Sequence, residues 1–343
     1  MTPQFNPREI LAAAPDAIAM GAGAKPDRPH PLANDLSLRN IAYACGTLSR
    51  KQLDFESDIS VVGRGMGTAD FSRSLAAGLR PGTIANYAAQ AEHLNFVAPQ
   101  EVSNFQPVDI RALEADVDLE PLAEGAEIQA FSAVLSGGAR EARLTTYARS
   151  ITIGRAAIIN NQVADMGRLF GSIGGSAARL EARMVAAAME ANAVLDDGNV
   201  VFDAKYSNVL GDAENPAPLI PTNLGLAMSL LRTQPTASGQ RADLRAKHLV
   251  VEPALELLAR QFVRDAGLDV MVSVLANLPP GRWYLLADQA ACPTVGILRL
   301  FGAKTPVRVE QRMPKIAVDG SCVTVTADLG ACMLRRTGIV RAG

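Results

Sequence analysis

Two stretches decide the fold, EADVDLEPLAEGAE at residues 114–127 and NQVADMGRLFGSIGGSAARLEARMVAAAMEANAVL at residues 161–195. The first holds no lysine or arginine, and its carboxylates are Glu114, Asp116, Asp118, Glu120, Glu124 and Glu127. A basic block that contains Arg140, Arg143 and Arg149 follows it. Blocks of opposite charge can pair with each other or across two copies of a chain. This order of acidic segment, basic segment and long apolar-striped segment is typical of a building block more than of a catalyst.

The acidic stretch predicts an extended two-stranded ribbon. In residues 116–120 the acids alternate with Val117 and Leu119, so their carboxylates share one face of a strand. Glu124 and Gly125 supply a turn, and the return follows residues 136–138. An isolated ribbon is marginally stable in water, so we expect this one to lie against another subunit. Exposed ion pairs contribute only ~0–1 kcal/mol each and set register more than strength.

The expected intersubunit contacts are therefore the acids of the ribbon and the arginines that follow it. They are Asp116, Asp118, Glu120, Glu124, Glu127, Arg140, Arg143 and Arg149. The same acids could instead form a solvent-facing strip, or supply a general acid and base or a cation site. The cation site is disfavoured because no motif adds the glycine-centred loop that calcium needs.

The second stretch predicts a long helix over residues 161–195. Its apolar residues recur mostly at gaps of three, four or seven, which is helical periodicity over about nine turns. At ~1.5 Å per residue such a helix reaches roughly 50 Å and would act as a spine. Gly171 to Gly175 indicate a kink or a close approach to a neighbour, and Asn160 or Asn161 can cap the start.

The flanking regions are less regular. Helices are expected over residues 8–20, 38–53 and 68–79, with a connector at 21–37 and a flexible glycine joint at Gly63, Gly65 and Gly67. Together they predict an extended arm over the first hundred residues. An α/β pattern follows residue 200, with strands at 248–251, 270–274 and 283–287 and a helix at 253–263. Later β-rich runs at 307–311, 316–318 and 322–327 predict a sheet closed by residues distant in sequence.

Composition bounds the function. The chain has 343 residues, of which 48% are hydrophobic and 20% charged, with a formal charge of −2. That balance indicates a globular, soluble protein of two or three domains, without the basic field that recruits nucleic acid or a membrane surface. The N-terminus lacks a secretory signal, and no window is apolar enough to span a membrane. We expect a cytoplasmic protein whose four cysteines stay reduced, since none forms a CxxC pair.

No catalytic constellation is evident. His30, His93 and His248 lack metal-ligand spacing, so neither a metal nor a cofactor is expected. Ser172 and Ser176 lie inside the helical stripe and are interpreted as packing residues, not nucleophiles. The glycine-rich segments lack the GK[ST] ending of a phosphate-binding loop. The sequence predicts a protein that is not an enzyme.

Several passages, in order, carry a family resemblance. They are GMGTADF at 65–71, EGAEI at 124–128, LTTYARSI at 144–151, AIINN at 157–161, AARLE at 177–181 and WYLLAD at 283–288. Through them the chain resembles the tailed-phage major capsid proteins, specifically the Mu-like prophage major head subunit family. That family is often encoded fused to a ClpP-type protease domain, which this sequence lacks.

The resemblance implies an α+β fold, the Hong Kong phage-type major capsid fold. Its parts would be an N-terminal arm at 1–104, an E-loop at 105–146, a P domain with the spine helix at 147–199, an A domain at 200–302, and a P-domain sheet with the C-terminal tail at 303–343. Some members of this fold crosslink an E-loop lysine to a neighbour's asparagine. None of the six lysines lies in the expected loop, so that crosslink is not expected.

The function implied is that of a major capsid, or head, protein of a bacteriophage or prophage. Such subunits self-assemble through pentamers and hexamers into an icosahedral shell that encloses double-stranded DNA. The implied partners are further copies of the chain, a portal protein, a scaffold or maturation protease, and the packaged DNA without sequence specificity. The implied location is the virion, assembled in the bacterial host cytoplasm. Two alternatives are an encapsulin-like nanocompartment and, much less favoured, an α/β hydrolase or peptidase.

Overall fold

The structure is a computed structural model, and it describes residues 6–49, 56–110, 113–114, 134–135, 138–211, 217–236, 239–311 and 320–343. The chain divides into two compact units. The first comprises Met1–Ala91, Thr146–Arg179 and Lys304–Asp328, and the second comprises Glu92–Thr145, Leu180–Ala303 and Leu329–Gly343. Each unit is thus assembled from segments distant in sequence. The mixture of helices and sheets confirms the predicted α+β class.

Helices dominate the first unit. They are α1 (Pro7–Gly21), α2 (Leu38–Ser49), α3 (Asp58–Met66), α4 (Ala69–Gln90) and α5 (Arg155–Ile159). Helix α1 begins where expected, because the Asn6 side chain accepts a hydrogen bond from the Arg8 backbone N–H at 3.0 Å. Helix α4 buries Phe71, Leu75 and Leu79, and packs on α1.

The helices within the expected arm pack against one another. The apolar faces of α1, α2, α3 and α4 are buried, and Ile10, Ile18 and Ile41 are almost fully enclosed. The glycine joint is also not flexible, since Gly63 and Gly65 lie inside α3. A Cβ on Gly65 would stand 1.7 Å from the Ala42 carbonyl oxygen, so this glycine lets α2 and α3 approach closely.

A three-stranded sheet completes the first unit. Its order is β12-β13-β6, with β6 at Thr145–Gly154, β12 at Val307–Gln311 and β13 at Gly320–Leu329. Strand β12 matches the predicted run, β13 extends the predicted one, and the expected strand at 316–318 lies outside the described residues. The pairing of β6 with β13 joins segments far apart in sequence, as predicted.

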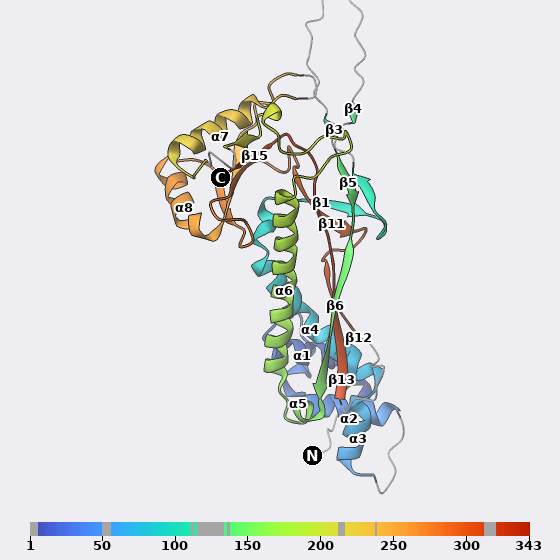
Figure 1. The fold of residues 1–343 in the computed structure, drawn as a ribbon. Helices are drawn as coiled ribbons and strands as arrows, with labels where there is room; N and C mark the ends of the chain where they lie inside the picture. The colour runs from blue at the N-terminus through green and yellow to red at the C-terminus, as the bar shows by residue number, and fades with distance from the viewer. Residues whose placement is uncertain are drawn as a thin grey trace, which may run out of the picture. The chain divides into compact units, whose positions relative to one another are not determined.

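The predicted spine is helix α6 (Val163–Glu190), one continuous helix of 28 residues (Figure 1). Its residues are divided between the two units. It is shorter than expected at its C-terminal end, because residues 191–195 leave the helix. Its glycines make the close approaches that were expected, since a Cβ on Gly174 would stand 2.1 Å from the Thr83 carbonyl oxygen. Asn161 does not cap α6 with its side chain, which instead accepts from the Leu38 N–H of α2 at 2.8 Å.

A five-stranded mixed sheet forms the centre of the second unit. Its order is β7-β15-β10-β8-β9, with β7–β15 and β8–β9 parallel and the other pairs antiparallel. The strands are β7 (Val209–Leu210), β8 (Ala246–Val251), β9 (Met271–Val274), β10 (Trp283–Ala287) and β15 (Ile339–Ala342). Strands β8, β9 and β10 and helix α8 (Glu256–Asp265) occur where the sequence predicts them, whereas helix α7 (Pro221–Thr233) was not predicted.

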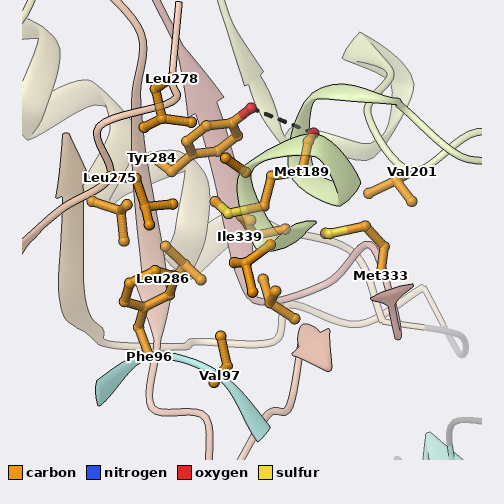
Figure 2. Close-up of a cluster of buried hydrophobic side chains, with 14 of the residues drawn as sticks. Phe96, Val97, Met189, Val201, Leu275, Leu278, Tyr284, Leu286, Met333 and Ile339 are labelled. Atoms are coloured by element: carbon orange, nitrogen blue, oxygen red, sulfur yellow. Dashed lines mark hydrogen bonds between the residues drawn. The ribbon is translucent and has the colours of Figure 1, made fainter. Parts of the chain in front are cut away.

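Side chains from the two faces of this sheet enter different cores. Leu249, Trp283 and Leu285 join a cluster with apolar residues of α7 and α8. Tyr284 and Leu286, which alternate with them on β10, join a cluster with Met189 of α6 (Figure 2). Because both faces are covered, β10 is buried at all five positions. This explains its nearly continuous apolar sequence.

A second sheet and a ribbon complete this unit. The sheet has the order β1-β11-β14, from Ala98–Val102, Val295–Leu300 and Ala331–Met333. The ribbon pairs β2 (Val108–Ile110) with β5 (Ala139–Ala142), and β3 (Leu113–Glu114) with β4 (Val134–Leu135), both antiparallel. Short 3-10 turns lie at Ala33–Asp35, Glu92–Asn95, Ala204–Tyr206 and Pro253–Leu255.

Candidate subunit contact surfaces

The ribbon is the first candidate contact surface. Its two described pairings are antiparallel, as the sequence predicted for residues 105–146. Near the β2–β5 pair, the Asp109 carboxylate accepts from the Glu141 N–H at 2.8 Å. The predicted acidic contacts Asp116, Asp118, Glu120, Glu124 and Glu127 lie outside the described residues.

The three predicted basic contacts are described, and all three side chains are exposed. Arg140 lies on β5, with its Nε 4.0 Å from a carboxylate oxygen of Glu141. Arg143 follows β5 in the second unit, whereas Arg149 lies on β6 in the first. Of the three arginines, Arg140 alone forms an ion pair with a described residue. That contact is long and solvated, so it leaves the guanidinium accessible.

Strand β6 is a further candidate contact surface, which sequence reasoning did not single out. It is an outer strand of its sheet, and eight of its ten residues are exposed, with Ile153 the buried one. Two hydroxyl contacts tie it to β13, Thr146 to the Asp328 carboxylate and Ser150 to Thr324, both at 2.6 Å. A long, exposed outer strand is a hazard for a lone monomer but suits a subunit whose neighbour covers it. The available signal was the run of strand-favouring Thr, Tyr and Ile residues in 145–152.

Exposed apolar side chains mark further candidate contact surfaces. In the second unit Leu257 on α8 is 77% exposed and Phe301, just after β11, is 75% exposed. Phe105 and Val108 near the ribbon are also exposed. Large apolar side chains left in water are typical of surfaces that a partner covers.

A buried ionic cluster fixes the interior of the second unit. Glu181 of α6 is fully buried, and its carboxylate binds the Arg299 guanidinium of β11 and, at 2.9 Å, Nε2 of His93. The cluster thereby joins α6, β11 and the turn at Glu92–Asn95. A paired buried carboxylate of this kind holds elements in place, and it is enclosed from substrate.

Tyr284 provides a second internal tie. Its hydroxyl donates to the Glu190 carboxylate at 2.6 Å and lies 3.4 Å from the Met189 carbonyl oxygen, the contact drawn in Figure 2. Burial, and then the hydrogen bond to Glu190, raise the pKa of this phenol well above its usual range. The group is therefore neutral and structural.

The described residues offer little to chemistry. In that part of the chain no cluster of His, Cys, Asp and Glu could hold a metal ion. Ser172 and Ser176 donate to backbone carbonyls of α6, but both are exposed, so the prediction that they are packing residues was wrong. The four cysteines are free thiols, and burial raises the pKa of Cys45 and Cys332 to about 12. Thiols with so high a pKa are poor nucleophiles at neutral pH.

Comparison with known families decides the class of protein. A family model described as phage capsid protein matches residues 139–342, more than half of the chain. The chain belongs to this family of phage capsid proteins. The match runs from β5 to β15 and includes β6, α6 and the five-stranded sheet.

The chain also has distant matches among solved structures. A virus-like particle from Pyrococcus furiosus is 13% identical, with 77% of this chain and 97% of that chain covered and a TM-score of 0.47. The capsid of Ralstonia phage GP4 is 11% identical, with 71% and 86% covered and a TM-score of 0.47. An encapsulin complex from Synechococcus elongatus is 11% identical, with 73% and 85% covered and a TM-score of 0.43. Comparison with curated proteins gives no match.

The phage capsid protein that the resemblance implied is thus confirmed. It works by self-association in a virion shell. Its described helices include none that is long and apolar enough to cross a membrane.

Proposed function

We propose that this capsid subunit assembles through pentamers and hexamers into an icosahedral shell that encloses double-stranded phage DNA. The family match over residues 139–342 is the observation that supports this proposal. The shell would receive DNA through a portal, with a scaffold or maturation protease as an assembly partner, in the cytoplasm of the bacterial host. The subunit would have no enzymatic activity. We also propose the Mu-like subfamily and the division into arm, E-loop, P domain and A domain.

The contacts proposed to join subunits are the acids of the ribbon and the exposed arginines of a neighbouring copy. The segment 114–127 carries six carboxylates and no cation, while Arg140, Arg143 and Arg149 are exposed. A shell repeats each contact by symmetry, so modest pairs suffice where a standard interface buries ~1,600 Å².

Charge reversal tests these contacts. Replacing Asp116, Asp118 and Glu120 by Lys is expected to block particle formation while the subunit stays folded, measured by electron microscopy and circular dichroism. A control with the same change in charge replaces the exposed acids Asp27, Asp165 and Asp265 by Lys and should still assemble. Adding Arg140→Glu, Arg143→Glu and Arg149→Glu to the first variant should restore particles. Normal shells from the first triple variant would overturn the ribbon contact.

The nature of the cargo separates the two kinds of shell. A phage capsid assembled with its genomic neighbours should hold DNA that resists added nuclease. An encapsulin-like nanocompartment, the alternative, would hold protein cargo and no protected DNA. Particles that copurify with a single enzyme would favour the nanocompartment.

A further inference from the structure

A basic groove flanks β9, the outer strand of the five-stranded sheet in the second unit. One hollow lies between the end of α7 and the segments around Lys247 and Asp288, and a second lies between α8 and β9. Leu268 and Val270 line both hollows, so the two are continuous along residues 268–272.

Cations outnumber carboxylates on the walls of the groove. Five cationic side chains face two acids, Asp269 and Asp288. Three of the cations already have partners, since Arg232 pairs with Asp243, Lys247 with Asp269, and Arg260 with Glu256, at 2.7 to 2.9 Å. Arg245 and Arg264 are exposed and form no ion pair with any described residue. These two arginines are free to bind an incoming anion.

The floor of the groove is apolar. Val263, Leu268, Val270 and Val272 are half-buried, and Met271 is 48% exposed. Clustered phosphates or a free inorganic anion would gain nothing from such a floor. An extended peptide gains from it, because alternate side chains can be apolar while the others carry charge.

The edge of β9 supplies backbone groups as well. The Leu275 backbone N–H donates to the Val251 carbonyl oxygen in β8. Alternate residues of a strand direct their backbone N–H and C=O to the same side, so those of Met271 and Ser273 also face β8. Val272 and Val274 therefore face the open edge. Glu92 accepts from the Val274 N–H at 3.1 Å and closes that end. Val272 therefore keeps its backbone N–H and C=O available for hydrogen bonds to a short added strand.

We propose that this groove binds an extended acidic segment of a partner polypeptide other than the capsid subunit itself. Carboxylates of the segment pair with Arg245 and Arg264, its alternating apolar side chains cover Val263 and Met271, and its backbone bonds to Val272. The choice of a separate partner rests on the proposed function, in which the acidic segment of this chain already pairs with Arg140, Arg143 and Arg149.

A labelled peptide tests the groove. The probe is an N-acetylated, fluorescein-labelled peptide of four Asp-Val repeats, titrated with the full chain and followed by fluorescence anisotropy. Binding should weaken by about tenfold or more in the Arg245→Gln, Arg264→Gln double variant. Arg241→Gln, a change at an exposed arginine outside the groove, should leave binding unchanged. A peptide of four Asn-Val repeats should bind at least tenfold more weakly than the acidic one.

Other outcomes would overturn the proposal. These are no binding at up to about 1 mM chain, or equal binding by the double variant. A duplex of about 20 base pairs that displaces the peptide and depends equally on Arg245 and Arg264 would make the groove a general anion surface. Tighter binding of a peptide with the sequence of residues 114–127 would assign the groove to a second copy. Shell formation is measured separately, and the double variant should assemble normally. If the chain binds the peptide but forms no shells, that result contradicts only the proposed function.

Discussion

Glu181 is a carboxylate without exposed surface, held by Arg299 and His93. Changing Glu181→Gln removes the negative charge but leaves the Arg299 guanidinium in place, only 12% exposed. Loss of one partner from a buried pair costs about 3–5 kcal/mol. We predict a drop of that order in the free energy of unfolding, measured by urea denaturation.

A surface pair provides the control for that substitution. Glu256 and Arg260 are about half exposed on α8, so Glu256→Gln should cost no more than about 1 kcal/mol. Equal losses from the two substitutions would show that the buried cluster does not hold the second unit together.

Asp197 makes the stability of the second unit depend on pH. Burial alone would raise the pKa of this carboxyl, but hydrogen bonds from Arg336 and Asn199 outweigh it and hold the pKa below its ordinary 3.8. A lowered folded pKa means that the stabilisation is present above the unfolded pKa and is lost as pH falls through the folded one.

The Arg336→Gln variant should therefore bring the pKa of Asp197 closer to its ordinary value. The stability of this variant should fall less than that of the natural chain between pH 5 and pH 2, in urea titrations at several pH values. NMR titration of the Asp197 carboxyl gives the direct reading. An unchanged pKa in the variant would contradict the assignment to Arg336.

At the scale of elements, glycines set how closely helices approach. Gly174 of α6 is buried against the Thr83 backbone, so Gly174→Ala should separate α6 from α4 and lower the free energy of unfolding by about 1–3 kcal/mol. Gly225 of α7 has open space around it, and Gly225→Ala should stabilise by up to about 1 kcal/mol because alanine favours a helix. Opposite signs in thermal unfolding would support the account, and two stabilising substitutions would contradict it.

The sequence predicts elements well where one periodicity dominates. The stripe of α6 and the apolar run of β10 are such cases, and both were found nearly at their predicted bounds. Helix α4 was predicted to end at Leu79, before Pro81 and Gly82, but it continues to Gln90. Burial of Thr83 and Tyr87 on the same face as Leu79 outweighs those local stop signals. Propensity alone cannot reveal such tertiary contacts.

The contact surfaces were predicted only in part. Charge blocks pointed to Arg140, Arg143 and Arg149, and all three are exposed. The groove beside β9 was not predicted, because Arg245 and Arg264 are separated in sequence and only the β8–β9 pairing brings their segments together. The acidic half of the proposed pairs stays a prediction, since residues 115–133 lie outside the described part of the chain.

For the molecule as a whole, the central claim is that this capsid subunit builds a closed shell. A family match over most of the chain's C-terminal two thirds supports it, as do an exposed outer strand and large apolar side chains left in water. Surfaces of this kind are costly in a monomer and are stabilised when neighbours cover them.

Negative-stain electron microscopy of the purified full chain, alone and coexpressed with its genomic neighbours, tests that claim most directly. The account predicts closed shells or regular tubes of one repeating subunit, with nuclease-resistant DNA inside the coexpressed particles. Only small soluble oligomers under both conditions would contradict it.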